Sequence, residues 1–186
     1  MTSAREIAID LLRRLLAGER GQVPLHLAML LEKSSPLDSD KHYLQILPPE
    51  LADLRLSPET ADEIISTLCA EVSRNPDEAL IAAVSFTGAD LATKTVTKTL
   101  TNPPRPLTMA EYQAALATLN CYLPYRLSKD SEFLSKDDLE RLVKLAEELQ
   151  NVAEIGTGAD RSARIGVRHH AAQFLKSLRT FGIVGS

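Results

Sequence analysis

Apolar residues recur at helical spacing along most of the chain. Between 136 and 154, leucine, valine and alanine return every three or four positions, and charged residues fill most of the gaps between them. At about 100° per residue, this spacing places the apolar side chains on one face of a helix and the charged side chains on the other. The segment 58–74 follows the same pattern through Ile64, Leu68 and Val72. Both segments are therefore expected to be amphipathic helices that bury one face.

Capping side chains mark where several helices begin. In a capping box, a hydroxyl and a carboxylate satisfy backbone N–H groups that the first helical turn leaves free. Capping boxes are indicated by Ser3-x-x-Glu6 and Thr108-x-x-Glu111, and further starts by Ser57–Pro58, Asn75–Pro76 and Ser135-x-x-Asp138. Together with the periodicity, these signals predict helices near 4–18, 24–33, 39–46, 49–54, 58–74, 76–87, 109–123, 136–154 and 161–181.

Two segments contain no charged residue and are expected at the centre of the fold. They extend from 79 to 89 and from 112 to 125. A helix that is apolar on all sides packs against neighbours on more than one side. We therefore expect Leu116 and Leu119 to be nearly fully buried. A second face of the same helix carries small residues, namely Ala110, Ala114, Ala117 and Cys121.

The segment 91–101 is open to two interpretations. Threonine alternates with lysine, valine and leucine from 93 to 101, which is the period of a strand, but no second strand is available to pair with it. We favour a poorly formed, exposed helix over an edge strand. The prolines that follow disfavour helix in the residues before them, so 102–106 is expected to be an extended linker.

The region from 139 to 178 carries the motifs of a helix pair. Its first helix has Leu-x-x-Leu-Val-x-Leu at 139–145, Asp160 follows in a turn, and its second helix has Val167-Arg168-x-x-Ala171-Ala172. These residues resemble one helix pair of the HEAT/armadillo-like α-helical repeats. The resemblance implies stacked helix pairs that present a binding surface, and it assigns Asp160 and Val167–Arg168 to the contact between neighbouring repeats.

The fold expected from these features is all-α. Eight or nine helices form a single domain over residues 1–186, arranged as an irregular or HEAT-like stack. The alternative is a division into two lobes, 1–101 and 107–186, joined by the proline-rich linker 102–106.

Composition is typical of a folded protein that works inside the cell. The 186 residues are 44% hydrophobic and 25% charged, which is enough to build a sizeable core. The two cysteines, Cys69 and Cys121, lie far apart in helical patterns and suit a reducing compartment. No apolar run approaches the roughly 18 residues of a membrane span, and charges near the N-terminus disagree with a signal peptide. We expect a soluble, cytoplasmic protein.

Basic residues gather on the last predicted helix and form the candidate site. The stretch 161–179 contains no acid, although the chain as a whole has a formal net charge of −4. Its cations, Arg161, Arg164, Arg168, Lys176 and Arg179, fall within roughly 120° of a helical wheel. Such a stripe is typical of docking to an acidic partner, a phosphate backbone or an anionic membrane. The alternative is a solvated polar face, neutralised by acids at 137–148 of the preceding helix.

No pattern typical of metal binding or catalysis occurs. The adjacent His169 and His170 would point about 100° apart on a helix, and no cysteine has ligand spacing. No strand–turn–helix context positions a nucleophile. We expect no metal ion and no cofactor.

The function favoured by the sequence is that of a non-catalytic adaptor or scaffold that binds another protein. A nucleic-acid-associated protein that uses the basic helix is the first alternative, and a small helical enzyme is the second. Phosphate contacts make affinity fall steeply with salt, which separates the first two classes. An enzyme would have a deep pocket with converging polar groups. No feature of the chain selects an oligomeric state.

Overall fold

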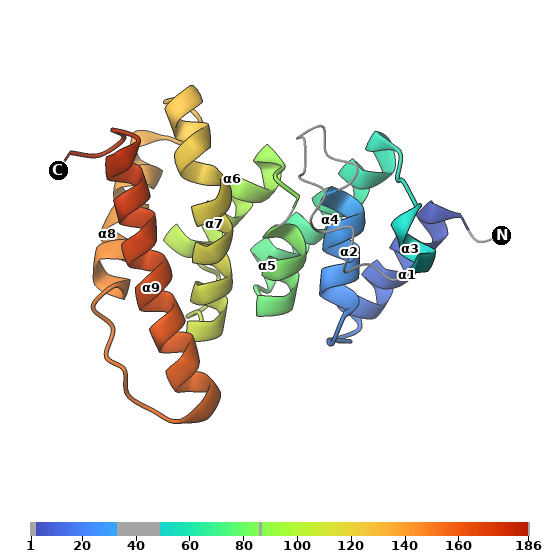
Figure 1. Ribbon diagram of the computed structural model, residues 1–186, viewed down its shortest axis with the longest axis horizontal. Coiled ribbons are helices and arrows are strands. Elements are labelled where there is room, and N and C mark those ends of the chain that lie inside the picture. Colours follow the sequence, from blue (N-terminus) through green and yellow to red (C-terminus); the bar gives the residue numbers. More distant parts are fainter. Residues whose placement is uncertain (1–2, 33–48, 86, 186) are drawn as a thin grey trace.

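The computed structural model describes residues 3–32, 49–85 and 87–185, and every regular element among them is a helix. The predicted all-α class with eight or nine helices is confirmed (Figure 1). The helix predicted over 39–46 lies outside the described residues. The helices are α1 (Ala4–Leu16), α2 (Val23–Glu32), α3 (Pro49–Ala52), α4 (Pro58–Arg74), α5 (Glu78–Ser85), α6 (Asp90–Thr101), α7 (Met109–Lys129), α8 (Lys136–Leu149) and α9 (Gly158–Thr180).

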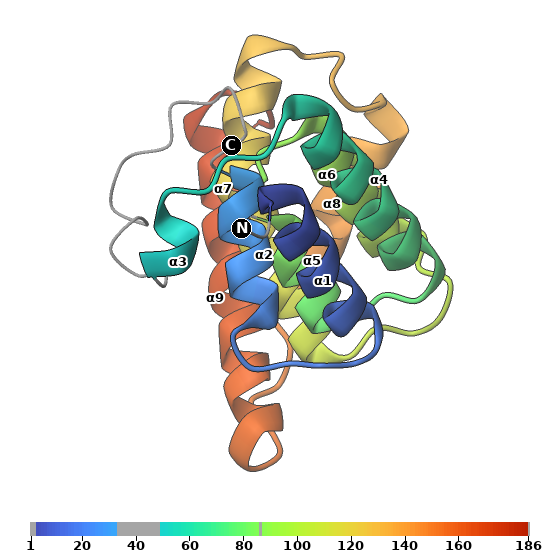
Figure 2. The same cartoon turned by 90° about the vertical axis from the view of Figure 1, so that its right-hand side faces the viewer.

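The longer helices form two layers. One layer contains α2, α5, α7 and α9, and the other contains α1, α4, α6 and α8 (Figures 1 and 2). Each helix of the second layer is followed in the chain by its partner in the first, so the pairs α1/α2, α4/α5, α6/α7 and α8/α9 stand side by side. The connections within these pairs lie at the lower edge of Figure 1, and α8 and α9 form one end of the molecule.

Most helices begin where the capping signals predict. In both predicted capping boxes, the hydroxyl oxygens of Ser3 and Thr108 accept a hydrogen bond from a backbone N–H at 3.2 Å, and a glutamate carboxylate accepts from the N-cap backbone N–H. Ser57 caps α4 and Ser135 caps α8, as expected. Asn75 does not cap a helix start: it ends α4, and Asp77 caps α5 by accepting from the Ala79 N–H at 3.0 Å.

The last three helices have different ends from those predicted. Helix α7 continues through Pro124 to Lys129, although proline removes one backbone hydrogen bond. Leu123, Pro124 and Leu127 are all buried there, so burial of this extra turn outweighs the missing bond. Helix α8 ends at Leu149 instead of near 154, and α9 begins at Gly158 instead of 161.

The segment 91–101 is helical, as favoured, but its predicted exposure is wrong. Ala92, Val96 and Leu100 are buried among α4, α7 and α8, and Thr93 and Thr97 are buried with them. The Thr97 hydroxyl donates to the Thr93 carbonyl oxygen at 2.9 Å, one turn back in the same helix. Because this bond satisfies the hydroxyl inside the helix, a threonine-rich segment with strand-like alternation is accommodated in the core.

The two uncharged helices lie at the centre, as predicted. Leu116 and Leu119 of α7 are 0% exposed, and Ile81 and Val84 of α5 are equally buried. Helices α5 and α7 contact each other directly. The same apolar cluster extends on both sides of the segment 102–106, from Ala8 to Leu178.

Arg105 holds the proline-rich segment 102–106 to α7 and to the turn between α4 and α5. Its Nη2 donates to Glu111 Oε1 at 2.7 Å and to the Pro76 carbonyl oxygen at 2.5 Å, and its Nη1 donates to Glu111 Oε2 at 3.0 Å. The Glu111 carboxylate raises the pKa of Arg105 above its ordinary value. Glu111 is 5% exposed, and a buried carboxylate is tolerated only when it is paired.

Substitution of Leu119 by alanine tests the position of the core. We expect Leu119→Ala to lower the free energy of unfolding by about 2–5 kcal/mol, because it leaves a cavity at the contact of several helices. Leu91→Ala is the control, since Leu91 is 48% exposed, and it should change stability by no more than about 0.5 kcal/mol. Urea unfolding measures both. A loss for Leu119→Ala as small as that for the control would place the core elsewhere.

Candidate functional site

The basic stripe lies on the last helix of its layer. Val167, Ala171 and Phe174 of α9 are fully buried on the side that meets α7 and α8. The cations lie on the other side of the helix. Arg161, Lys176 and Arg179 are exposed, whereas Arg164 and Arg168 are only partly exposed.

Two of the five cations are already held in ion pairs. Arg164 Nε lies 3.0 Å from Asp160 Oδ2, one turn earlier in the same helix, and the Arg164 side chain is only 22% exposed. Arg168 Nη1 pairs with Glu154, and its Nε donates to the Gln150 carbonyl oxygen at 3.3 Å. The contacts of Arg168 fasten the connection between α8 and α9 onto the side of α9. Asp160, which the repeat resemblance assigns to a contact between repeats, is thus engaged within its own helix.

The other three cations are Arg161, Lys176 and Arg179. In the part of the chain that the structure describes, no carboxylate forms an ion pair with Arg161, Lys176 or Arg179. Two acids of α8 are engaged within their own helix instead: Asp137 pairs with Arg141 at 2.9 Å, and Glu140 pairs with Lys136 at 3.7 Å.

Uncharged residues share the exposed face of α9 with these cations, and Ile165 and Ala172 lie in line with them. Ile165 is 44% exposed, and Ala172 is also exposed. Sequence reasoning that followed charge alone missed both residues. Each lies four residues after an arginine, Arg161 or Arg168, and this spacing could have placed them on the same face of the helix. One line along this face consists of Arg161, Ile165, Arg168, Ala172, Lys176 and Arg179, and we call these six residues the outer stripe. The exposed Ser162, His169 and Gln173 lie beside it.

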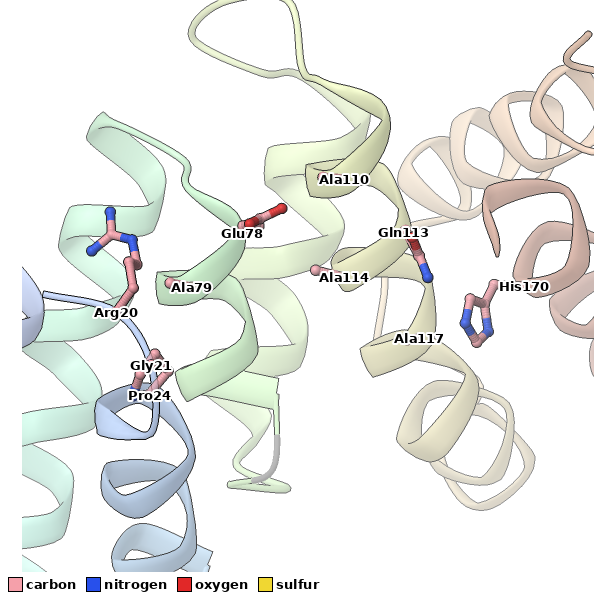
Figure 3. Close-up of a pocket in the computed structure, with 10 residues that line it drawn as sticks. All are labelled: Arg20, Gly21, Pro24, Glu78, Ala79, Ala110, Gln113, Ala114, Ala117 and His170. Carbon is pink, nitrogen blue, oxygen red and sulfur yellow. The ribbon is translucent and has the colours of Figure 1, made fainter. Parts of the chain in front are cut away.

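A groove of about 500 Å³ runs across the layer formed by α2, α5, α7 and α9. From α9 it is lined by His170, on the side of the helix away from the outer stripe. Its floor is the small-residue face of α7, formed by Ala110, Ala114 and Ala117 (Figure 3). Pro24 of α2 and Ala79 of α5 line one side. The groove is therefore mostly apolar, with a floor that comes close to the backbone of α7.

The polar groups of the groove lie on opposite walls. Figure 3 shows Arg20 and Glu78 on one side and Gln113 and His170 on the other. Arg20 is engaged with Asp77, at 3.1 Å between Nη2 and Oδ2. These side chains do not converge on a common point.

Helices α7 and α9 meet closely at the edge of this groove. A Cβ on Gly166 would overlap the side-chain amide of Gln113, so glycine leaves room for that side chain between the two helices. Farther along, Asn120 Nδ2 donates to the His170 carbonyl oxygen at 3.0 Å. Burial, and secondly the charge of His169, lower the pKa of His170 below its ordinary value.

No protein family, curated protein or solved structure was found that matches this chain. Among residues 3–32, 49–85 and 87–185, no three histidine, cysteine, aspartate or glutamate side chains are grouped to hold a metal ion. Within the same ranges, no helix combines the length and apolar character needed to cross a membrane.

The lowered pKa of His170 predicts a pH-dependent stability. Since the folded protein binds this proton less tightly than the unfolded chain does, the free energy of unfolding should decrease as pH falls below about 6.5. His170→Gln should remove part of this decrease, as measured by urea unfolding across a pH series. His169→Gln is the control and should retain most of it, because burial is the larger cause of the shift. Parallel curves for wild type and His170→Gln would contradict the assignment.

A double-mutant cycle tests the contact between Gly166 and Gln113. Alanine is favoured over glycine inside a helix by about 1 kcal/mol. When Gln113 is present, however, the Cβ of alanine at position 166 has to displace the Gln113 side chain. We expect Gly166→Ala to be more favourable by at least about 0.5 kcal/mol when Gln113 is also alanine. Thermal or urea unfolding of the four proteins gives this coupling. Strictly additive effects would show that the close approach at Gly166 has another cause.

Proposed function

We propose that the protein is a non-catalytic adaptor or scaffold, built from stacked helix pairs, that docks another protein on the outer face of α9. The observation that supports this proposal is the set of three exposed cations, Arg161, Lys176 and Arg179, without an acidic partner among the described residues. They occupy a stretch free of acids in a chain whose formal net charge is −4.

Charge separation of this kind favours a specific encounter. A local positive surface on a negative protein attracts and orients an acidic partner, and it repels partners of the wrong charge. The position of α9 at the end of the molecule leaves this face open, because its contacts with α7 and α8 are on other sides (Figure 1). A partner docked there would not disturb the core.

Charge reversal at the exposed cations tests the proposal. Lys176→Glu with Arg179→Glu should reduce binding of the native partner at least tenfold, because attraction becomes repulsion. The partner is identified by co-purification with the wild-type chain from its native host, and its affinity is then measured for each variant. The free energy of unfolding should change by no more than about 1 kcal/mol per substitution, since both side chains are exposed.

Arg13→Glu with Lys98→Glu is the matched control. Both residues are exposed, and, like Arg179, each lies in the last turn of its helix, so the control has the same change in net charge and a similar interaction with the helix dipole. It should retain partner binding. Equal loss of binding in both double variants would show that net charge, and not the outer face of α9, governs the interaction. Undiminished binding in the α9 variant would refute the docking site.

A further inference from the structure

We propose that the partner segment that docks on α9 is an acidic amphipathic helix. This inference rests on the proposed function and specifies the chemistry of the partner. It follows from the order, spacing and exposure of the six residues in the outer stripe, of which the cations are only a part.

The spacing of the outer stripe suits contact with a second helix. From Arg161 to Arg179, successive members are four, three, four, four and three residues apart. Their mean spacing, 18 residues over five steps or 3.6, keeps the side chains in a line along a helix, and such a line packs against a similar line on another helix. At 1.5 Å per residue, the stripe is about 27 Å long, which matches a partner helix of about 18 residues.

The uncharged members of the stripe add a requirement that charge alone does not impose. Ile165, 44% exposed, lies one turn from Arg161 and offers an apolar contact. Ala172 has a short side chain and lets a neighbouring backbone approach closely. A phosphate backbone would use the cations but would leave Ile165 in contact with polar groups. A helix with an apolar centre and acidic ends satisfies both kinds of residue.

The distribution of free charge sets where the acids of the partner belong. Arg161 lies at one end of the stripe, and Lys176 and Arg179 lie at the other. Arg168, between them, is engaged with Glu154. The partner helix should therefore carry acidic residues near both ends of its contact face and small or aliphatic residues in the middle. The main packing contacts of α9 are with α7 and α8.

Synthetic peptides test the helical requirement directly. The first peptide is helical, with glutamates opposite Arg161, Lys176 and Arg179 and leucine or alanine opposite Ile165 and Ala172. The second has the same composition in an order that breaks the stripe, and the third probe is a DNA duplex with a matched number of charges. Binding of each to the full chain is measured by fluorescence anisotropy. We expect the first peptide to bind at least tenfold more tightly than either of the other probes.

Substitution of Ile165 separates apolar contact from charge. Ile165→Ser should weaken binding of the helical peptide at least fivefold and leave binding of the scrambled peptide unchanged. Ile155→Ser is the matched control, because Ile155 is 63% exposed but lies outside the stripe, in the connection before α9. It should have no effect. Circular dichroism checks that each variant keeps its helical fold.

The possible outcomes distinguish this inference from the proposed function. Equal affinity for the two peptides, lost in Lys176→Glu with Arg179→Glu, would overturn the helical partner and retain electrostatic docking on α9. If neither peptide binds but binding of the native partner is still reduced by that double variant, the helical partner is likewise overturned and electrostatic docking on α9 is retained. Tighter binding of the DNA duplex would overturn the acidic helix in favour of phosphate. Insensitivity of the native partner to the double variant would remove both proposals.

Discussion

The buried carboxylate of Glu111 constrains the arrangement of the central helices. A carboxylate at 5% exposure must be paired, and its partners are the Arg105 guanidinium and the Thr108 backbone N–H. Because Arg105 also donates to the Pro76 carbonyl oxygen, this one network fixes the start of α7 against the turn between α4 and α5. Helix α7 contacts α5, α6 and α9, so its placement determines where the rest of the molecule packs.

The position of α9 follows from α7. Gly166 lets α9 approach the Gln113 side chain, and the Asn120 amide binds the backbone at His170. Elsewhere on α9, Arg168 secures the preceding connection through Glu154, and Arg164 pairs with Asp160 in the first turn of the same helix. The structure thus divides the basic residues of α9 by role. Two stabilise the local fold, and the remaining three face outward together with Ile165 and Ala172.

Local signals predicted most of the helices, and tertiary contacts account for what they missed. The capping boxes at Ser3 and Thr108 depend on residues three apart, so the sequence alone identifies them. The passage of α7 through Pro124 depends on burial supplied by distant helices, and the burial of α6 depends on threonine hydroxyls bonded within the helix. For the candidate site, spacing predicted one face, but the pairing of Arg168 with Glu154, fourteen residues earlier, depends on how the connection folds.

The contrast between α8 and α9 explains why charge on a surface helix is not by itself a sign of function. Both helices lie at the same end of the molecule, and both expose charged side chains. On α8, Lys136 pairs with Glu140 and Asp137 pairs with Arg141, each four residues apart, so part of its charge is compensated within the helix. On α9, Asp160 is the only acid in the helix, and it forms an ion pair with Arg164. Among the residues that the structure describes, the exposed cations that remain form no ion pair, and the apolar Ile165 between them adds surface that water solvates poorly. An acidic helix would compensate both, and this is the physical basis of the docking that we propose for the outer face of α9.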